Sequence, residues 1–259
     1  MSHKRNFLAR IGKRFLDFLE ILGRLAMFTL IAVRSIVSRP FYFKQLMRQC
    51  VSIGYYSLPV VAMTIIFTGA ALALQTYSGF SRFSAEGAVA TVVVLGITRE
   101  LAPVMAGLMV AGRVGAAIAA EIGTMKVTEQ IDALTTLSTN PQKYLVVPRV
   151  IAGTIMLPLL VVIGDIFGVF GGFLVAVYTL GFNGSNYLRK TLEYLEPIDV
   201  YSGLIKAAVF GFIVAIMGCY HGYNSKGGAQ GVGAATTNAV VSASVLILIA
   251  NYIVTDLLF

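Results

Sequence analysis

The sequence contains no tryptophan, and only two cysteines and two histidines occur among its 259 residues. The two cysteines, Cys50 and Cys219, are too few to suggest a disulfide framework. His3 and His221 have no cysteine or carboxylate neighbours at the spacing of metal ligands. Neither a disulfide-stabilised secreted domain nor a metal site is therefore expected.

Catalytic motifs are also missing. The stretch "HGYNSKGGAQGVGAATT" at 221–237 is glycine-rich, but it lacks the glycine-lysine-serine/threonine order in which the lysine reaches nucleotide phosphates. No serine-hydrolase motif occurs either. We therefore expect a chain that is not an enzyme and holds no cofactor or metal of its own.

Charged residues are scarce, at 12%, whereas apolar residues make up 57% of the chain and the mean hydropathy is +0.81. Such a composition indicates an integral membrane protein. Apolar stretches near the ~20 residues that cross a bilayer predict an all-α fold of a single domain, 1–259, with five transmembrane helices. The expected spans are about 51–76, 86–112, 150–178, 201–222 and 236–258.

The basic residues are unevenly distributed. Ten of the twenty lysines and arginines precede the first span, which predicts a cytoplasmic N-terminus and, with five spans, a C-terminus outside. The 113–149 and 223–235 loops then lie inside, while Arg82, Arg189 and Lys190 lie outside near Glu193, Glu196 and Asp199. The pI near 9.6 reflects charges placed to face anionic lipid, so nucleic-acid binding is not expected.

The segment before the first span has its own pattern. Residues 7–38 are helical in pattern, with an apolar stripe at Phe7, Ile11, Phe15, Phe18 and Leu22 and a charge every few positions up to Arg24. This favours a helix lying in the cytoplasmic membrane interface. Pro40 then ends that helix and turns the chain toward the first span.

Arg99 and Glu100 interrupt the second span. Arg99 follows Glu86 by 13 residues, or ~20 Å of helix, which places it near the middle of the membrane. A charge there costs at least ~2.5–3.5 kcal/mol, so both residues are expected to face a protein interior or a wet cavity. Because neighbours on a helix diverge by ~100°, each needs its own partner, and Asp165 is a candidate for Arg99. Pro103 lacks an N–H, so it frees the carbonyl of Arg99 and favours a kink.

Three functions fit these intramembrane charges. They can serve a transporter subunit, an ion-coupled secondary transporter that uses Arg99, Glu100 and Asp165 as a relay, or a structural scaffold in which they form packing ion pairs. Small residues at four-residue spacing predict close contacts between helices, either within the chain or between two copies of it. Gly115 is a candidate for a contact between two copies. The two series are Gly164, Gly168 and Gly172, and Ala111, Gly115, Ala119 and Gly123.

The inner loop predicts a short amphipathic helix over 128–137. Thr128 is the expected cap, Glu129 supplies negative charge in the first turn, and Ile131 and Leu134 form one apolar side. Asn140 and Pro141 read as the cap and first position of the next helix. Such a helix can dock into a motor subunit or rest on the membrane.

Two stretches carry a resemblance to a known family. The run "RELAPVMAGLMVAGRVGAAIAAEIGTMKVTEQIDAL" at 99–134, together with "LALQTY" at 72–77, closely resembles the MlaE/YrbE-type permeases, the membrane subunits of MCE-associated lipid ABC transporters. The resemblance covers essentially the whole chain. It implies a homodimer of five-span permeases in the bacterial inner membrane, with phospholipid as cargo. It also implies a partner ATPase that binds ATP and Mg²⁺, a periplasmic MCE-domain protein and, in some systems, a STAS-domain subunit.

The resemblance further implies roles for particular residues. Arg99 and Glu100 are expected at a lipid-binding cavity, together with Leu72, Gln75 and Tyr77 of the second matching stretch. The stretch around 121–132 is expected to correspond to the coupling helix that enters the ATPase. The expected contacts there are Glu121, Thr128, Glu129, Gln130, Ile131, Asp132 and Leu134.

Overall fold

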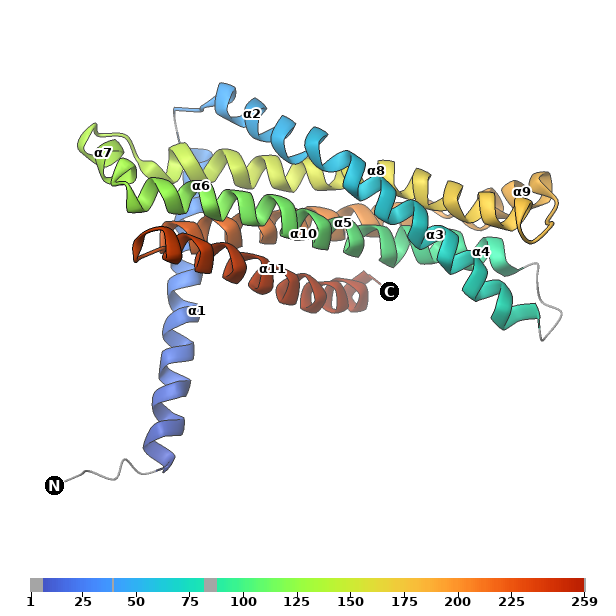
Figure 1. Ribbon diagram of the computed structural model, residues 1–259, viewed down its shortest axis with the longest axis horizontal. Coiled ribbons are helices and arrows are strands. Elements are labelled where there is room, and N and C mark those ends of the chain that lie inside the picture. The colour runs from blue at the N-terminus through green and yellow to red at the C-terminus, as the bar shows by residue number, and fades with distance from the viewer. Residues whose placement is uncertain (1–6, 39, 82–87, 259) are drawn as a thin grey trace.

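The computed structural model describes residues 7–38, 40–81 and 88–258, with side chains for all of these except 7–11 and 18. His3, Arg82 and Glu86, on which some of the predictions above depend, lie outside the described residues, as do the side chains of Phe7, Ile11 and Phe18. Within the described ranges the chain is a bundle of helices without strands (Figure 1). The all-α fold predicted from the sequence is confirmed.

Five continuous helical stretches are long and apolar enough to cross a membrane. The first joins α2 (Phe43–Ile53), η1 (Tyr55–Ser57) and α3 (Leu58–Phe80). The second joins α4 (Val89–Gly96), η4 (Ile97–Leu101), α5 (Ala102–Val110), η5 (Ala111–Gly115) and α6 (Ala116–Val127). The third joins η6 (Gln142–Val146) and α8 (Val147–Tyr178), and α10 (Pro197–Tyr223) and α11 (Gly228–Leu258) are the fourth and fifth.

These stretches are longer than the spans expected from hydropathy. The second runs for 39 residues to Val127, although the sequence placed an inner loop from residue 113. The sequence from Ala116 to Val127 is rich in alanine and free of proline, so nothing in it stops the helix. At ~1.5 Å per residue a 39-residue helix is about twice as long as the ~30 Å hydrocarbon core. The bundle is therefore longer than an apolar layer is thick.

Two shorter helices lie at opposite ends of the bundle. The helix α7 (Gln130–Thr136) is at one end and α9 (Gly184–Tyr194) is at the other (Figure 1). Because α7 belongs to the predicted inner side, its end of the bundle is called the α7 end below.

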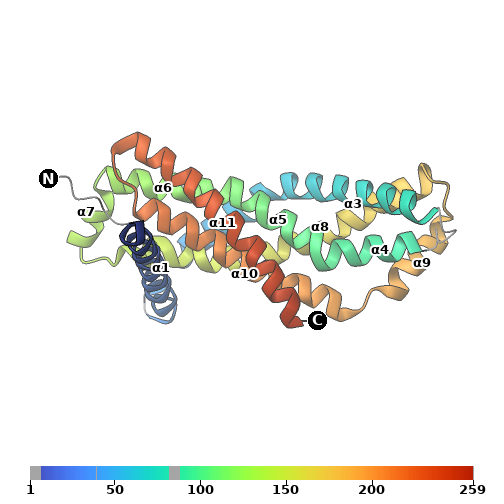
Figure 2. The ribbon, with the colours of Figure 1, turned by 90° about the horizontal axis from the view of Figure 1, so that it is seen from below.

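The N-terminal helix α1 (Phe7–Val37) crosses the α7 end roughly at a right angle to the bundle (Figures 1 and 2). Its C-terminal half contacts the bundle, where Phe28 and Ala32 are buried and Phe28 packs on Tyr220 of α10 at a ring distance of 5.6 Å. Its N-terminal half stands free, with Phe15 and Leu16 exposed. A helix perpendicular to the spans has the orientation that a membrane-interface helix needs, and the interfacial placement itself stays a prediction.

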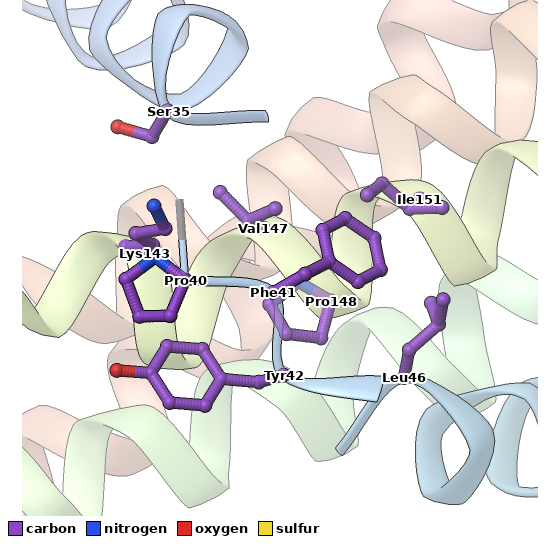
Figure 3. A pocket seen from close by; sticks show the side chains of 9 residues that line it. All are labelled: Ser35, Pro40, Phe41, Tyr42, Leu46, Lys143, Val147, Pro148 and Ile151. Carbon is purple, nitrogen blue, oxygen red and sulfur yellow. The ribbon is translucent and has the colours of Figure 1, made fainter. Parts of the chain in front are cut away.

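The turn between α1 and α2 is fastened to the start of the third span. The ammonium of Lys143, buried in η6, donates to Oγ of Ser38 at 2.7 Å, and Tyr42 packs edge-on against Tyr144. A small cavity of about 10 Å³ remains between the turn and α8 (Figure 3). At that size it holds about one water molecule. It is lined by Ser35, Pro40, Phe41, Tyr42, Leu46, Lys143, Val147, Pro148 and Ile151.

The small-residue series pack within the chain. A Cβ on Gly69 of α3 would collide with the carbonyl of Gly168 of α8, so these two helices touch backbone to backbone. A Cβ on Gly115 would lie 3.5 Å from Val214 of α10. Gly115 is therefore a contact inside one chain, and the expectation that it lies between two copies is wrong.

Candidate functional site

The site is built around a widened helical turn in the second span. From Ile97 to Leu101 the backbone forms a π-helical turn, η4, immediately before Pro103. Proline cannot donate the hydrogen bond that would normally end on the carbonyl of Arg99. The ammonium of Lys206 on α10 donates to that carbonyl instead, at 2.8 Å. A π turn is a frequent feature of functional sites because it re-aims side chains.

Arg99 pairs with Asp199, not with Asp165 as the sequence analysis expected. Its Nε donates to Oδ1 of Asp199 at 2.6 Å. Asp199 is fully buried in the first turn of α10, where it also accepts from the backbone N–H of Glu196 at 3.0 Å. The Arg99 side chain, in contrast, is one third exposed. The prediction failed because Asp199 was assigned to an outer loop, whereas α10 already begins at Pro197.

Glu100 has a different set of partners, as expected for neighbours that diverge on a helix. The ammonium of Lys206 donates to Oε1 of Glu100 at 2.6 Å, and Nδ2 of Asn251 donates to Oε2 at 2.9 Å. The hydroxyl of Thr255 lies 3.2 Å from Oε1. Lys206 is fully buried, whereas the Glu100 side chain is 39% exposed. Two opposite charges thus form each pair, so the cluster is neutral overall.

Close packing of α10 against the π turn makes these contacts possible. A Cβ on Gly203 would lie 2.5 Å from the carbonyl oxygen of Thr98, so a larger residue would push the two helices apart. Asp199, Gly203 and Lys206 follow one another at spacings of four and three residues and therefore share a face of α10. The glycine brings the two charged residues on either side of it within reach of Arg99 and Glu100.

The cluster lies at the level where two helices end. Asp199 belongs to the first turn of α10 and Thr255 to the last turn of α11. Figures 1 and 2 show the C-terminus of α11 part-way along the bundle, while α4 and α9 continue farther from the α7 end. Arg99 and Glu100 are partly exposed at this level, and their partners Asp199 and Lys206 are buried. The outward side of the cluster is therefore accessible to a ligand.

The other expected cavity residues divide into two groups. Leu72 packs over Gly96, which lies one turn before Arg99. A Cβ added to Gly96 would lie 3.2 Å from Cδ2 of Leu72. Gln75 is exposed on the same face of α3, one turn further along the helix. Tyr77 points elsewhere and packs edge-on against Phe182 at 5.8 Å. Leu72 and Gln75 thus lie on the side of the cluster, and Tyr77 belongs to the packing of α3 on the end of α8.

Asp165 does not join the cluster in the part of the chain that the structure describes. It lies in the middle of α8, and its Oδ1 is buried without a hydrogen-bond partner there. A proton relay through Asp165, Arg99 and Glu100 needs contacts that these residues do not make. No group of three or more metal-ligating side chains occurs among the described residues either.

Four residues of the cluster escaped the sequence analysis. Lys206 is the single lysine or arginine in the fourth span, so the cost argument that singled out Arg99 applied equally to it. The other three residues meet Arg99 and Glu100 only through contacts between distant segments, so the cost argument did not single them out. They are Asp199, Asn251 and Thr255.

The short helix expected over 128–137 exists as α7, but its details differ from the prediction. Thr128 ends α6, and its hydroxyl donates back to the carbonyl of Thr124 at 2.8 Å, so it does not cap α7. Glu129 precedes α7 with a left-handed backbone, φ 60°. Asn140 does act as a cap, because its Oδ1 accepts from the N–H of Gln142 at 3.0 Å.

Ile131 and Leu134, the expected apolar side of α7, face the rest of the bundle. Ile131 is 1% exposed and Leu134 is half-buried against the core, so neither forms the outer surface of the helix. Gln130 and Asp132 are exposed, and Asp132 pairs with Lys126 at 3.0 Å. On the outer side Ala133 and Leu137 are exposed, Leu137 by 74%.

Glu121 lies away from α7, on the body of α6. Its carboxylate pairs with the guanidinium of Arg149 at 2.8 Å. Arg149 is fully buried at the start of α8 and donates to the carbonyl of Leu145 at 2.6 Å. Glu121 therefore fastens the last turns of the second span to the third, next to the expected coupling region.

The family model described as Permease MlaE matches residues 46–257. The chain belongs to the MlaE permease family. Among curated relatives, a "Probable ABC transporter permease protein" of Rickettsia bellii is 62% identical over 254 residues, covering 98% of both chains. The "Intermembrane phospholipid transport system permease protein MlaE" of Haemophilus influenzae is 34% identical over 260 residues, with 98% of both chains covered.

A third relative comes from a plant. "Protein TRIGALACTOSYLDIACYLGLYCEROL 1, chloroplastic" of Arabidopsis thaliana is 36% identical over 227 residues, which cover 88% of this chain and 65% of the plant protein. These relatives support an ABC transporter permease of the MlaE family, a non-catalytic membrane subunit. They favour this function over the ion-coupled transporter and the scaffold. The polar cluster described above is thus part of an MlaE-family permease.

Proposed function

We propose that this MlaE-family permease moves phospholipids between the bacterial inner membrane and a periplasmic MCE-protein assembly. A separate ABC ATPase subunit, which binds ATP and Mg²⁺, drives the movement. In this proposal the permease is a homodimer with a cytoplasmic N-terminus and a periplasmic C-terminus, and a STAS-domain subunit accompanies it in some assemblies.

One observation carries the proposal. Arg99 and Glu100 are held by the buried partners Asp199 and Lys206, yet each remains about one third exposed at the level where α11 ends. A guanidinium and a carboxylate side by side match the phosphate and the amine of a zwitterionic headgroup. The surrounding helices are apolar and suit acyl chains. Because Asp199 and Lys206 keep both charges paired, a headgroup can bind the exposed sides of Arg99 and Glu100 while the buried pairs stay intact.

Lipid transfer in reconstituted vesicles tests the proposal. The complex of permease and ATPase is placed in one vesicle population with a fluorescent phospholipid, and ATP-dependent transfer to the MCE protein is measured. Arg99→Ala and Glu100→Ala are expected to reduce transfer strongly while the complex still assembles. Arg189→Ala, which removes an exposed arginine of α9, is the matched control and is expected to transfer normally.

Two results would contradict the proposal. Normal transfer by both Arg99→Ala and Glu100→Ala would show that the cluster is not the lipid site. Purification of a stable permease that neither binds an ATPase nor stimulates its ATP hydrolysis, with transport driven by a proton gradient, would favour the ion-coupled alternative.

A further inference from the structure

A second polar site lies near the α7 end of the bundle, between α2 and α6. A cavity of about 160 Å³ opens there, far larger than the ~15 Å³ that one water needs. Its polar lining comes from Gln49 and Ser52 of α2, Arg113 of η5 and Glu121 of α6. Arg113 follows Arg99 by fourteen residues, so about 21 Å of helix separates the two sites. One headgroup cannot contact both.

Arg113 brings an uncompensated positive charge to this cavity. Its guanidinium donates to Oγ of Ser57 at 2.7 Å and to the carbonyl of Ser52 at 3.2 Å, and it lies 5.9 Å from the ring centre of Tyr56. No carboxylate lies within ion-pair distance of it in the described parts of the chain. Of the five N–H donors of an arginine, two are used. The remaining donors are free to bind an anion.

Glu121 does not neutralise Arg113, although both line the cavity. Its carboxylate pairs with the buried guanidinium of Arg149 at 2.8 Å. That pair is neutral in itself, so the net charge at the cavity is that of Arg113.

Gln49 provides a second, independent sign of a ligand. The residue is 6% exposed and lines the cavity, and its amide makes no hydrogen bond within the residues that the structure describes. The amide is therefore available to a ligand that enters the cavity. An amide N–H₂ group beside a guanidinium with unused donors is a suitable cradle for the oxygens of a phosphate.

An apolar stripe leads away from the cavity along α3. It begins at Tyr56, whose ring stacks with Arg113, and continues on one helix face because its members follow at spacings of four, three, four and seven residues. All of its members are 45% exposed or more. They are Tyr56, Val60, Met63, Phe67 and Leu74. A free phosphate has no use for such a surface, whereas the acyl chains of a lipid do.

We propose that the Gln49–Arg113 cavity binds the phosphate of a membrane phospholipid whose acyl chains lie along the Tyr56–Leu74 stripe. This site is separate from the Arg99–Glu100 cluster and does not depend on the transport function. The bound lipid replaces the missing anion at Arg113. The bound lipid also contacts both the junction of α2 and α3, at η1, and α6, the helix that leads to α7.

Lipid photo-labelling of the purified full-length permease tests the proposal. The probe is a phosphatidylglycerol with a diazirine in one acyl chain, and the labelled peptides are identified by mass spectrometry. Wild type is expected to be labelled within 56–67. Arg113→Gln is expected to lose at least about tenfold in affinity, since a hydrogen-bonded charge pair is worth ~1.5–3 kcal/mol. Gln49→Leu is expected to weaken labelling as well.

Three controls make the result specific. Arg48→Gln removes one positive charge from the neighbouring position of α2 without lining the cavity, and is expected to label normally. Arg113→Lys keeps the charge and is expected to retain part of the labelling, which separates binding from a folding defect. Arg99→Gln is expected to label 56–67 normally, so failure of the transport site and failure of this site are distinguishable.

Several outcomes would overturn the proposal. Equal labelling of wild type and Arg113→Gln would do so, as would equal losses in Arg113→Gln and Arg48→Gln. Displacement of the lipid by millimolar inorganic phosphate would identify a free-phosphate site instead. A change in the number of chains per particle without a change in labelling would assign this face to contact between two copies.

Discussion

The ammonium of Lys206 donates to the carbonyl oxygen of Arg99 at 2.8 Å, which supplies the hydrogen bond that Pro103 cannot make. The same ammonium pairs with Glu100 at 2.6 Å. One buried lysine thus satisfies both a backbone defect and an intramembrane carboxylate. The proline, the widened turn and the charge pair form one structural unit, because the same ammonium contacts both the freed carbonyl and the carboxylate.

The Glu100–Lys206 pair predicts a specific pattern of stability. Lys206→Met leaves Glu100 without its cation and is expected to lower the unfolding free energy by about 2 kcal/mol. This is less than the ~3–5 kcal/mol of a fully buried pair, because the Glu100 side chain is 39% exposed. The double variant Lys206→Met, Glu100→Gln removes both charges and is expected to recover part of the loss. Thermal unfolding in detergent measures both, and equal midpoints for the single and double variants would contradict the pairing.

The sequence predicted the elements of this fold better than the site. Crossing a bilayer requires about twenty consecutive apolar residues, so the five spans are evident from local composition. The cost of intramembrane charge likewise singled out Arg99 and Glu100. Both arguments need only neighbouring residues, and the structure places Arg99 and Glu100 in one polar cluster.

Partners of these charges depend on contacts between distant segments. Asp199 follows Arg99 by one hundred positions, and nothing local reveals that the two helices meet. A local signal for the start of α10 did exist, because Glu196, Pro197 and Asp199 form a capping box with proline at the first position. With that signal Asp199 belongs to a helix and not to a loop.

The α7 end of the bundle shows a different limit. Thr128 is a good cap by residue type, but α6 runs on to Val127 and the hydroxyl bonds back to Thr124. Ile131 and Leu134 do form an apolar side, as predicted. Periodicity gives the face of a helix but not what that face contacts, and here it contacts the permease itself.

Gly203 predicts a strong effect from one methyl group. In Gly203→Ala the new Cβ would lie 2.5 Å from the carbonyl oxygen of Thr98, so α10 must move away from the π turn. We expect a clear loss of thermal stability. Gly233→Ala is the matched control, because this helical glycine has nothing within 4 Å of its Cβ position. The control is expected to be stabilised by up to ~1 kcal/mol, and equal effects of the two variants would show that α10 does not pack here.

Tyr187 predicts a dependence on alkaline pH. Burial between α9 and the third span raises the pKa of this phenol to about 12, and its hydroxyl has no hydrogen-bond partner among the described residues. Because the folded-state pKa lies above the ordinary value of ~10, the neutral phenol contributes stability below pH 10 that is lost as the pH rises toward 12. Tyr187→Phe is expected to lose less stability over this interval. It is also expected to be at least as stable as wild type at pH 7, since it removes an unpaired buried hydroxyl.

Absorbance of tyrosinate during an alkaline titration checks the assignment. The group that titrates last in wild type is expected to be missing from Tyr187→Phe. An unchanged titration curve would show that another tyrosine titrates last.

The outer face of α7 predicts how the permease contacts its proposed ATPase. Leu137 is 74% exposed and Ala133 lies one turn before it, so these two residues form the apolar surface that a partner can cover. Leu137→Asp is expected to release the ATPase, because a buried apolar anchor at such an interface carries ~2 kcal/mol or more. The permease itself is expected to keep its elution profile, since the new carboxylate is solvated in the isolated chain.

Ile131→Asp is the contrasting variant, and it separates docking from folding. Its side chain is 1% exposed, so an aspartate there would be buried in the permease and is expected to lower the stability of α7 and the neighbouring core. Pull-down of the ATPase, with permease thermal stability measured in parallel, distinguishes the two effects. Leu137→Asp should lose the ATPase at unchanged stability, whereas Ile131→Asp should lose stability as well. If Leu137→Asp retains the ATPase fully, the outer face of α7 is not the docking surface, and a helix that rests on the membrane becomes the better explanation.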